Sequence, residues 1–174
     1  MFIMKIIGCI LVIISSTGMG FFLSNEMRCR IDNLKELKKL INLLRGDIKY
    51  ANTPLPEAIS TITRRQSGSY DAFFNYISKK LYEMSGQTFS QIWMEAVHKE
   101  LAETSLSKKD KLQMVQFGEN LGYLDKDMQM NTIDLFLSQI EEEIKDLSKT
   151  IKEKAYMCNT LGIMSGIFII IIMI

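Results

Sequence analysis

The sequence has little of what catalytic, metal-binding and nucleic-acid-binding proteins need. Its 174 residues include one histidine, three cysteines and two prolines, and 21 basic residues against 20 acidic ones leave a net charge of only +1. Phosphate neutralisation needs a basic surplus, so this balance argues against a nucleic-acid-binding protein. Three widely separated cysteines cannot form a closed disulfide framework. The scarcity of proline and glycine disfavours the many turns of an all-β fold, so we expect an α-helical chain.

No combination of residues indicates chemistry. His98 has no cysteine partner nearby, and the cysteines do not have zinc-ligand spacing. The GxxxxGK loop that cradles nucleotide phosphates is absent. Three successive glutamates, 141–143, point about 100° apart on a helix, so a solvated face with a Glu141–Lys145 pair explains them better than a metal site. We predict a protein that is not an enzyme, with no catalytic, cofactor-binding or metal-binding residues and no small-molecule substrate.

Charge is missing from both ends of the chain. Residues 6–25 and 155–174 are uncharged throughout, and each run makes a helix of about 30 Å, the thickness of a bilayer's hydrocarbon core. The first run could instead be a cleaved signal peptide, and the second a buried core helix. However, the first continues past its small residues to Leu23, and the second is apolar on all sides near its end. We therefore predict transmembrane helices in 1–25 and 155–174.

The positive charges near these two segments predict the topology. Only Lys5 lies beyond the first span, whereas nine cations flank the inner ends of the two spans. Cytoplasmic flanks carry the excess of lysine and arginine, so we predict a two-span protein of the cell membrane. Its domain 26–154 is cytosolic and its termini are both on the opposite face. The nine cations are Arg28, Arg30, Lys35, Lys38, Lys39, Lys145, Lys149, Lys152 and Lys154.

Apolar residues between the spans recur at helical spacing, and no segment has the alternation of a strand. The sequence predicts an all-α, six-helix antiparallel bundle. The first expected helix ends near residue 52. The next four cover about 54–66, 70–84, 88–101 and 107–122, and the last starts at 125. The first apolar stripe consists of Leu34, Leu37, Ile41, Leu44 and Ile48. We expect the last helix to continue without a break into the C-terminal span.

Helix boundaries and glycines give more local predictions. Thr53 is an expected N-cap with Pro54 as the first helical residue, and Ser107 caps the fifth helix with Asp110 three residues on. Gly118 and Gly122 each cost about 1 kcal/mol in a helix, so they predict a close helix crossing or a turn. The residues expected to face the core from the fifth helix are Leu112, Val115 and Leu121.

Small residues recur four apart within the predicted spans, at Ser16 and Gly20 and at Gly162 and Gly166. Small side chains let helix backbones approach closely in lipid, where no hydrophobic force draws helices together. We therefore expect these four residues to form the packing face of the membrane helices. The alternative is that glycine is simply common in membrane helices.

Several motifs occur in an order and spacing that resemble one known family. They are Leu44-Arg45-Gly46-Asp47-Ile48-Lys49-Tyr50, Thr53-Pro54-Leu55, Glu57-Ala58, Trp93 before Glu95-Ala96, Phe117-Gly118, Leu121-Gly122, Asp125, Gln129, Leu161-Gly162 and Gly166. With the two terminal spans, this pattern resembles the stage III sporulation protein AB family of endospore-forming bacteria over nearly the whole chain. Gly46 is a departure, because a bulkier or charged helix former is expected there.

The resemblance implies a membrane component of the channel complex that joins mother cell and forespore. The family is similar to the F-type platform proteins of type II secretion and type IV pilus systems, which have six-helix cytosolic domains. It implies a non-enzymatic platform in the outer forespore membrane, with the bundle in the mother-cell cytosol. The implied partners are the ATPase stage III sporulation protein AA and other membrane proteins of the complex. The alternative is a membrane-tethered helical domain that binds a small ligand or another protein, which a deep apolar cavity would favour.

Two surfaces are candidates for partner binding. The first is the corner formed by Thr53, Pro54, Leu55 and Glu57, a rigid exposed turn with a carboxylate beside a helix N-terminus; simple stabilisation of the helix dipole explains it equally well. The second is a basic face, which could instead meet anionic lipid headgroups. It consists of Lys35, Lys38, Lys39, Arg45 and Lys49.

Overall fold

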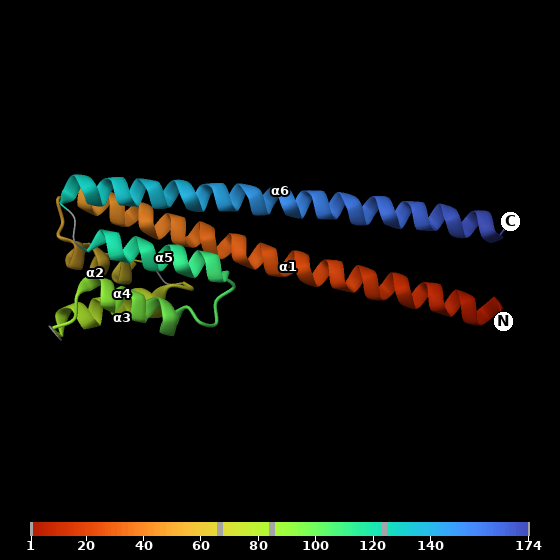
Figure 1. The fold of residues 1–174 in the computed structure, drawn as a ribbon, viewed down its shortest axis with the longest axis horizontal. Coiled ribbons are helices and arrows are strands. Elements are labelled where there is room, and N and C mark those ends of the chain that lie inside the picture. The colour runs from red at the N-terminus through yellow and green to blue at the C-terminus, as the bar shows by residue number, and fades with distance from the viewer. Residues whose placement is uncertain (1, 66–67, 84–85, 123–124, 174) are drawn as a thin grey trace. The chain divides into compact units, whose positions relative to one another are not determined.

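The fold is all-helical in the part of the chain that the structure describes (Figure 1). The computed structural model describes the backbone of residues 2–65, 68–83, 86–122 and 125–173, and the side chains of 25–64, 68–83, 86–122, 125–154 and 156–157. Within these ranges there are six helices and no strand, as predicted. The helices are α1 (Phe2–Lys49), α2 (Leu55–Arg65), α3 (Asp71–Tyr82), α4 (Phe89–Glu100), α5 (Lys108–Leu121) and α6 (Lys126–Met173).

The chain divides into two compact units. Residues 32–144 form the first, which we call the body. It holds the last part of α1, all of α2 to α5, and the first part of α6. Residues 1–31 and 145–174 form the second, which we call the terminal unit.

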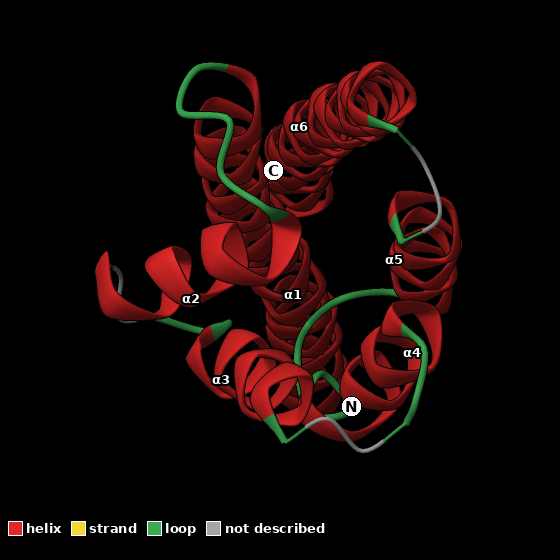
Figure 2. Ribbon diagram, turned by 90° about the vertical axis from the view of Figure 1, so that its left-hand side faces the viewer, coloured by secondary structure: helices red, strands yellow, loops and turns green. Residues whose placement is uncertain are grey.

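The helices of the body run alternately up and down. The Tyr70 hydroxyl, at the start of α3, donates to the Asn33 carbonyl of α1, whereas Lys126, at the start of α6, donates to the Lys49 carbonyl at the end of α1. Consequently α1, α3 and α5 end at the same end of the body, which we call the turn end. Figure 2 looks onto this end and shows the connections to α2, α4 and α6 facing the viewer.

Trp93 of α4 occupies the centre of the core and has 0% of its surface exposed. Its ring packs edge-to-face on Phe73 of α3, with the centroids 4.9 Å apart, and on Phe117 of α5 at 5.5 Å. Its Nε1–H donates to the Met114 carbonyl at 2.8 Å. The indole therefore joins three helices while its one polar atom is satisfied. All five residues of the predicted α1 stripe are also buried.

Glycine makes the close approach of α4 and α5 possible, as predicted. A Cβ atom at Gly118 would overlap Cδ1 and Cγ of the Trp93 ring, and one at Gly122 would lie 2.9 Å from Cδ1 of Phe89. A larger residue at Gly118 must displace the indole or separate the helices. By contrast, a Cβ at Gly46 of α1 would meet nothing within 4 Å.

The predicted core face of α5 is wrong at Leu112 and Val115, whereas Leu121 is buried as predicted. Leu112 is 58% exposed, and Val115 is only half-buried. The buried face instead runs through Asp110, Met114, Phe117, Gly118 and Leu121. Leu112 lies about 120° around the helix from Gly118, and α5 turns its glycine rather than that leucine toward α4 because the glycine admits the indole ring.

The predicted helix starts are correct to within one residue. Ser107 caps α5 in a capping box with Asp110, as predicted. At the start of α2, the Pro54 carbonyl accepts the first helical bond from the Ala58 amide at 3.0 Å, so Pro54 takes the capping place that we predicted for Thr53. The Thr53 amide instead donates to the Asp47 carbonyl at 3.1 Å.

The terminal unit consists of the first part of α1 and the last part of α6. α6 is a single helix from Lys126 to Met173. Among the residues that the structure describes, no helix has a segment long and apolar enough to cross a membrane. Residues 1–24 and 158–174, nearly all of the two predicted spans, lie outside the described side chains. The predicted packing residues, namely Ser16, Gly20, Gly162 and Gly166, are among them.

Candidate docking surface

The α1–α2 corner is held by backbone geometry and by one lysine. Asn52 has φ of 50°, in the left-handed region that a short polar side chain tolerates. This conformation ends α1 at Lys49, three residues before the predicted end. The Lys126 ammonium of α6 donates to the Lys49 carbonyl at 3.2 Å and to the Asn52 side-chain oxygen. One of the unpaired carbonyls at the end of α1 is thereby satisfied, and the corner is fastened to α6.

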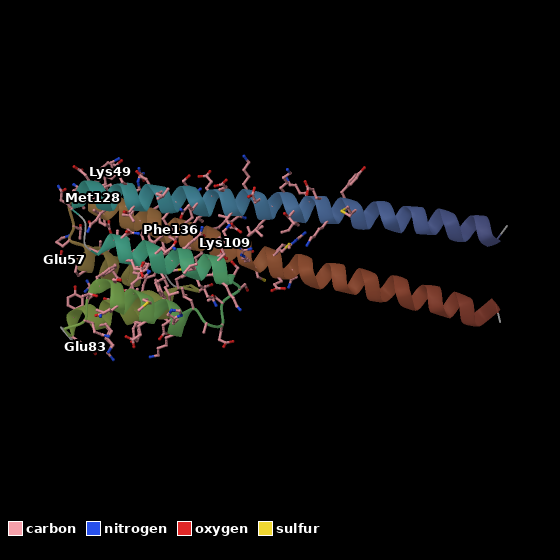
Figure 3. The ribbon with its side chains drawn as sticks, in the orientation of Figure 1. Lys49, Glu57, Glu83, Lys109, Met128 and Phe136 are labelled. Carbon is pink, nitrogen blue, oxygen red and sulfur yellow. The ribbon has the colours of Figure 1, made fainter. Side chains whose placement is uncertain are left out.

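The predicted corner residues come together at the turn end. Pro54 and Glu57 are exposed, whereas Thr53 and Leu55 are half-buried. Glu57 lies in the first turn of α2, and within the described residues its carboxylate makes no ion pair. Figure 3 shows Glu57, with Lys49 and Met128, at this end.

Tyr50 was missing from the predicted corner, although among the residues that the structure describes in the body it is the most exposed aromatic one. It directly follows α1 and is 77% exposed, and the Lys49 ammonium lies 5.5 Å from its ring centroid. The predicted end of α1 near Asn52 left Tyr50 inside the helix. The corner thus presents an aromatic ring and two prolines beside a carboxylate.

The predicted basic face is split by ion pairs between α1 and α6. Arg45 Nε lies 2.6 Å from Asp134 Oδ1, and its Nη2 donates to Oδ2 at 3.2 Å. Lys38 Nζ lies 3.1 Å from the Glu141 carboxylate, so Glu141 pairs between helices rather than with Lys145 as predicted. These two cations are paired with carboxylates of α6, so they are not fully available to a partner.

The other three basic residues lie at the surface. Lys35 is 3.8 Å from Asp32, both largely exposed, and such a pair contributes little. Lys39 and Lys49 are exposed. The remaining positive surface is therefore smaller than the sequence indicated, and the corner is the stronger docking candidate.

A polar cluster on α3 and α4 contains two groups with shifted pKa values, Tyr76 and Glu95. A hydrogen bond to the Glu95 carboxylate, more than desolvation, raises the pKa of Tyr76 to about 12. The same bond is the main cause that lowers the pKa of Glu95, and Gln87 adds to it. Lys99 Nζ lies 4.8 Å from the Tyr76 ring centroid. Every group in this cluster has a partner on the surface, which is typical of a structural network rather than of a general base.

A groove between α5 and α6 was not predicted from the sequence. It has a volume of about 110 Å³, and its lining includes Gln113, Gln116 and Asn120 of α5 and Thr132, Leu135 and Gln139 of α6. It is not a deep apolar cavity of the kind that the small-ligand alternative requires. The described residues also hold no group of three or more histidine, cysteine or acidic side chains placed for a metal ion.

Comparison with known proteins finds relatives over nearly the whole chain. A family model described as Stage III sporulation protein AB (spore_III_AB) matches residues 5–174. Stage III sporulation protein AB of Bacillus subtilis (strain 168) is 24% identical over 170 residues, which cover 98% of this chain and 99% of that protein. A solved structure of Stage III sporulation protein AB (SpoIIIAB) has a TM-score of 0.64 and 26% identity, with 71% of this chain and 97% of that chain covered. The resemblance predicted from the motifs is confirmed.

Proposed function

Because the chain belongs to the stage III sporulation protein AB family, we propose that it is a non-enzymatic membrane platform of the channel complex needed for endospore formation. In this proposal the turn end of the body docks the partner ATPase, stage III sporulation protein AA. The body transmits or anchors the work of that ATPase at the membrane.

The observation that carries the docking proposal is the construction of the α1–α2 corner. Its backbone is fastened through Lys126, whereas Tyr50 and Glu57 project from it into solvent. A rigid support with an exposed aromatic residue suits recognition, because little conformational entropy is lost on binding. The Glu57 carboxylate favours a partner surface that carries lysine or arginine.

The two uncharged runs, 6–25 and 155–174, are the proposed membrane helices. They anchor the body on the mother-cell side of the outer forespore membrane. The excess of cations between the two runs, next to their inner ends, supports this orientation. Other membrane proteins of the complex would then meet the platform within the bilayer.

A labelling experiment tests this topology. In a chain whose three native cysteines are replaced by serine, single cysteines are placed by Phe2→Cys, Ser105→Cys and Ile174→Cys. In non-sporulating cells that express the chain it would lie in the cell membrane, so a membrane-impermeant maleimide added to their intact protoplasts should label both terminal variants and leave the exposed Ser105 position unlabelled until lysis. Labelling of Ser105→Cys in intact cells, or protection of either terminus, would contradict the proposed orientation.

Charge reversal at the corner tests the docking. Glu57→Lys should weaken capture of the ATPase by solubilised full-length protein about tenfold or more, equivalent to roughly 1.4 kcal/mol of binding free energy. The measurement is the ATPase concentration needed for half-maximal capture.

The matched control for this test is Glu103→Lys, which reverses another exposed carboxylate, in the α4–α5 connection at the other end of the body. It should leave capture unchanged. Thermal unfolding of both variants checks the fold, because Glu57→Lys also loses a helix-dipole interaction of about 0.3–1 kcal/mol. Equal capture by the wild type and both variants would remove the corner from the binding surface.

A further inference from the structure

The α5–α6 groove is open in the middle and closed at both ends. Phe117 and Phe136 stack at its floor with ring centroids 4.4 Å apart, and Figure 3 shows Phe136 between the two helices. At one end the Gln129 side-chain amide donates to the Leu121 carbonyl at 3.2 Å. At the other, Lys109 Nζ donates to the Glu143 carboxylate at 2.7 Å. Both helices are therefore held in place around the groove before anything binds.

The lining of the groove carries no charge, although 24% of the chain is charged. Its walls are mainly amide side chains from Gln113, Gln116 and Gln139, over the aromatic floor. The nearest acidic residue of α6, Asp134, pairs with Arg45 of α1. The surface is thus neutral and rich in groups that both donate and accept hydrogen bonds.

Large apolar side chains stand exposed around this neutral groove. Leu135, which lines it, is 62% exposed. Leu112 lies one turn before Gln116 on α5, and Met128 lies two turns before Leu135 on α6; both are more than half exposed. The same surface therefore offers a hollow with an aromatic floor and an apolar side chain that projects beside it.

We propose that the α5–α6 groove is the surface through which two copies of this chain pair, with Leu135 of each copy seated in the groove of the other. A two-fold interface requires one surface to be complementary to itself. An apolar projection beside a hollow with an aromatic floor meets that requirement. Amides opposite amides satisfy one another, because each both donates and accepts.

Charge favours a second copy over a different partner. Two copies of a charged face repel each other, whereas two copies of a neutral face do not. The groove offers no charge by which to select a partner of opposite sign, in contrast to the α1–α2 corner. Pairing through the groove leaves the corner free, so this inference does not depend on the proposed ATPase docking.

Opposite charges placed on both walls of the groove test the pairing. Two differently tagged copies of the full chain are expressed together, and capture of one by the other is measured after mild detergent solubilisation. Copies that both carry Gln116→Glu and Gln139→Glu should capture each other at least tenfold less than wild-type copies, and so should copies that both carry Gln116→Lys and Gln139→Lys. The acidic variant and the basic variant together should restore capture, whichever walls meet, which also shows that both variants fold.

The control adds two charges elsewhere on the body, through Ala72→Glu and Asn75→Glu on the exposed face of α3, and should leave capture unchanged. Undiminished capture between two acidic copies would overturn the proposal. Failure of the mixed pair would overturn it too. Unchanged pairing together with loss of ATPase capture would reassign the groove to the ATPase.

Discussion

Trp93→Ala is expected to lower the free energy of unfolding by about 3–5 kcal/mol, a large part of the roughly 5–15 kcal/mol that a domain has in total. The indole is fully buried and contacts rings of α3 and α5, so its removal leaves a cavity where three helices meet. Thermal unfolding of the solubilised full chain, followed by far-ultraviolet circular dichroism, measures the loss.

Two other variants separate the contributions to this loss. Trp93→Phe retains an aromatic ring but removes the Nε1–H donated to the Met114 carbonyl, and should cost about 1–2 kcal/mol. Met94→Ala changes the next residue of α4, which is 39% exposed, and should stay within about 0.5 kcal/mol of the wild type. A Trp93→Ala melting curve that coincides with that of Met94→Ala would show that α4 does not organise the core.

The order and approximate ends of the helices could be predicted because the signals are local. Leu34, Ile41 and Ile48 repeat at helical spacing and are all buried, since a helix with one apolar stripe must turn that stripe toward its neighbours. Ser107 and Asp110 form the predicted capping box because its partners lie three residues apart. Such features depend only on residues that lie a few positions apart in the chain.

Contacts between distant segments could not be predicted. Arg45 and Asp134 are 89 residues apart in sequence, and no local rule pairs them. The same limitation explains the α5 face. Counting apolar residues favoured Leu112, whereas the position of the helix is decided by the Trp93 ring, which needs Gly118 opposite it.

The candidate site was predictable in part for similar reasons. Pro54 marks the corner in the sequence, because proline restricts the residue before it. Tyr50 was missed because its exposure depends on where α1 ends. That end depends on Asn52 and on Lys126 of α6, which is distant in the sequence. The groove was missed because glutamine and asparagine produce neither an apolar stripe nor a charge pattern. The uncharged runs at 112–118 of α5 and 128–133 of α6 were the signal that could have indicated it.

Gly46 of α1 and Gly118 of α5 should respond to alanine in opposite directions. At Gly46 a Cβ meets nothing, so Gly46→Ala should stabilise the chain by about 0.5–1 kcal/mol, the difference in helix propensity. At Gly118 the Cβ overlaps the Trp93 ring, so Gly118→Ala should destabilise the chain by about 1–3 kcal/mol despite the same gain in propensity. Melting temperatures measured side by side give the two signs.

A double substitution identifies the indole as the cause. Because the overlap involves Cδ1, Cγ and Nε1 of Trp93, all of which alanine lacks, Gly118→Ala should cost less in the Trp93→Ala background than in the wild type. The coupling between the two sites should lie between about 0.5 and 3 kcal/mol, as is usual for residues in contact. If the two costs simply add, or if Gly118→Ala raises the melting temperature as Gly46→Ala does, the close crossing of α4 and α5 is not set by this glycine.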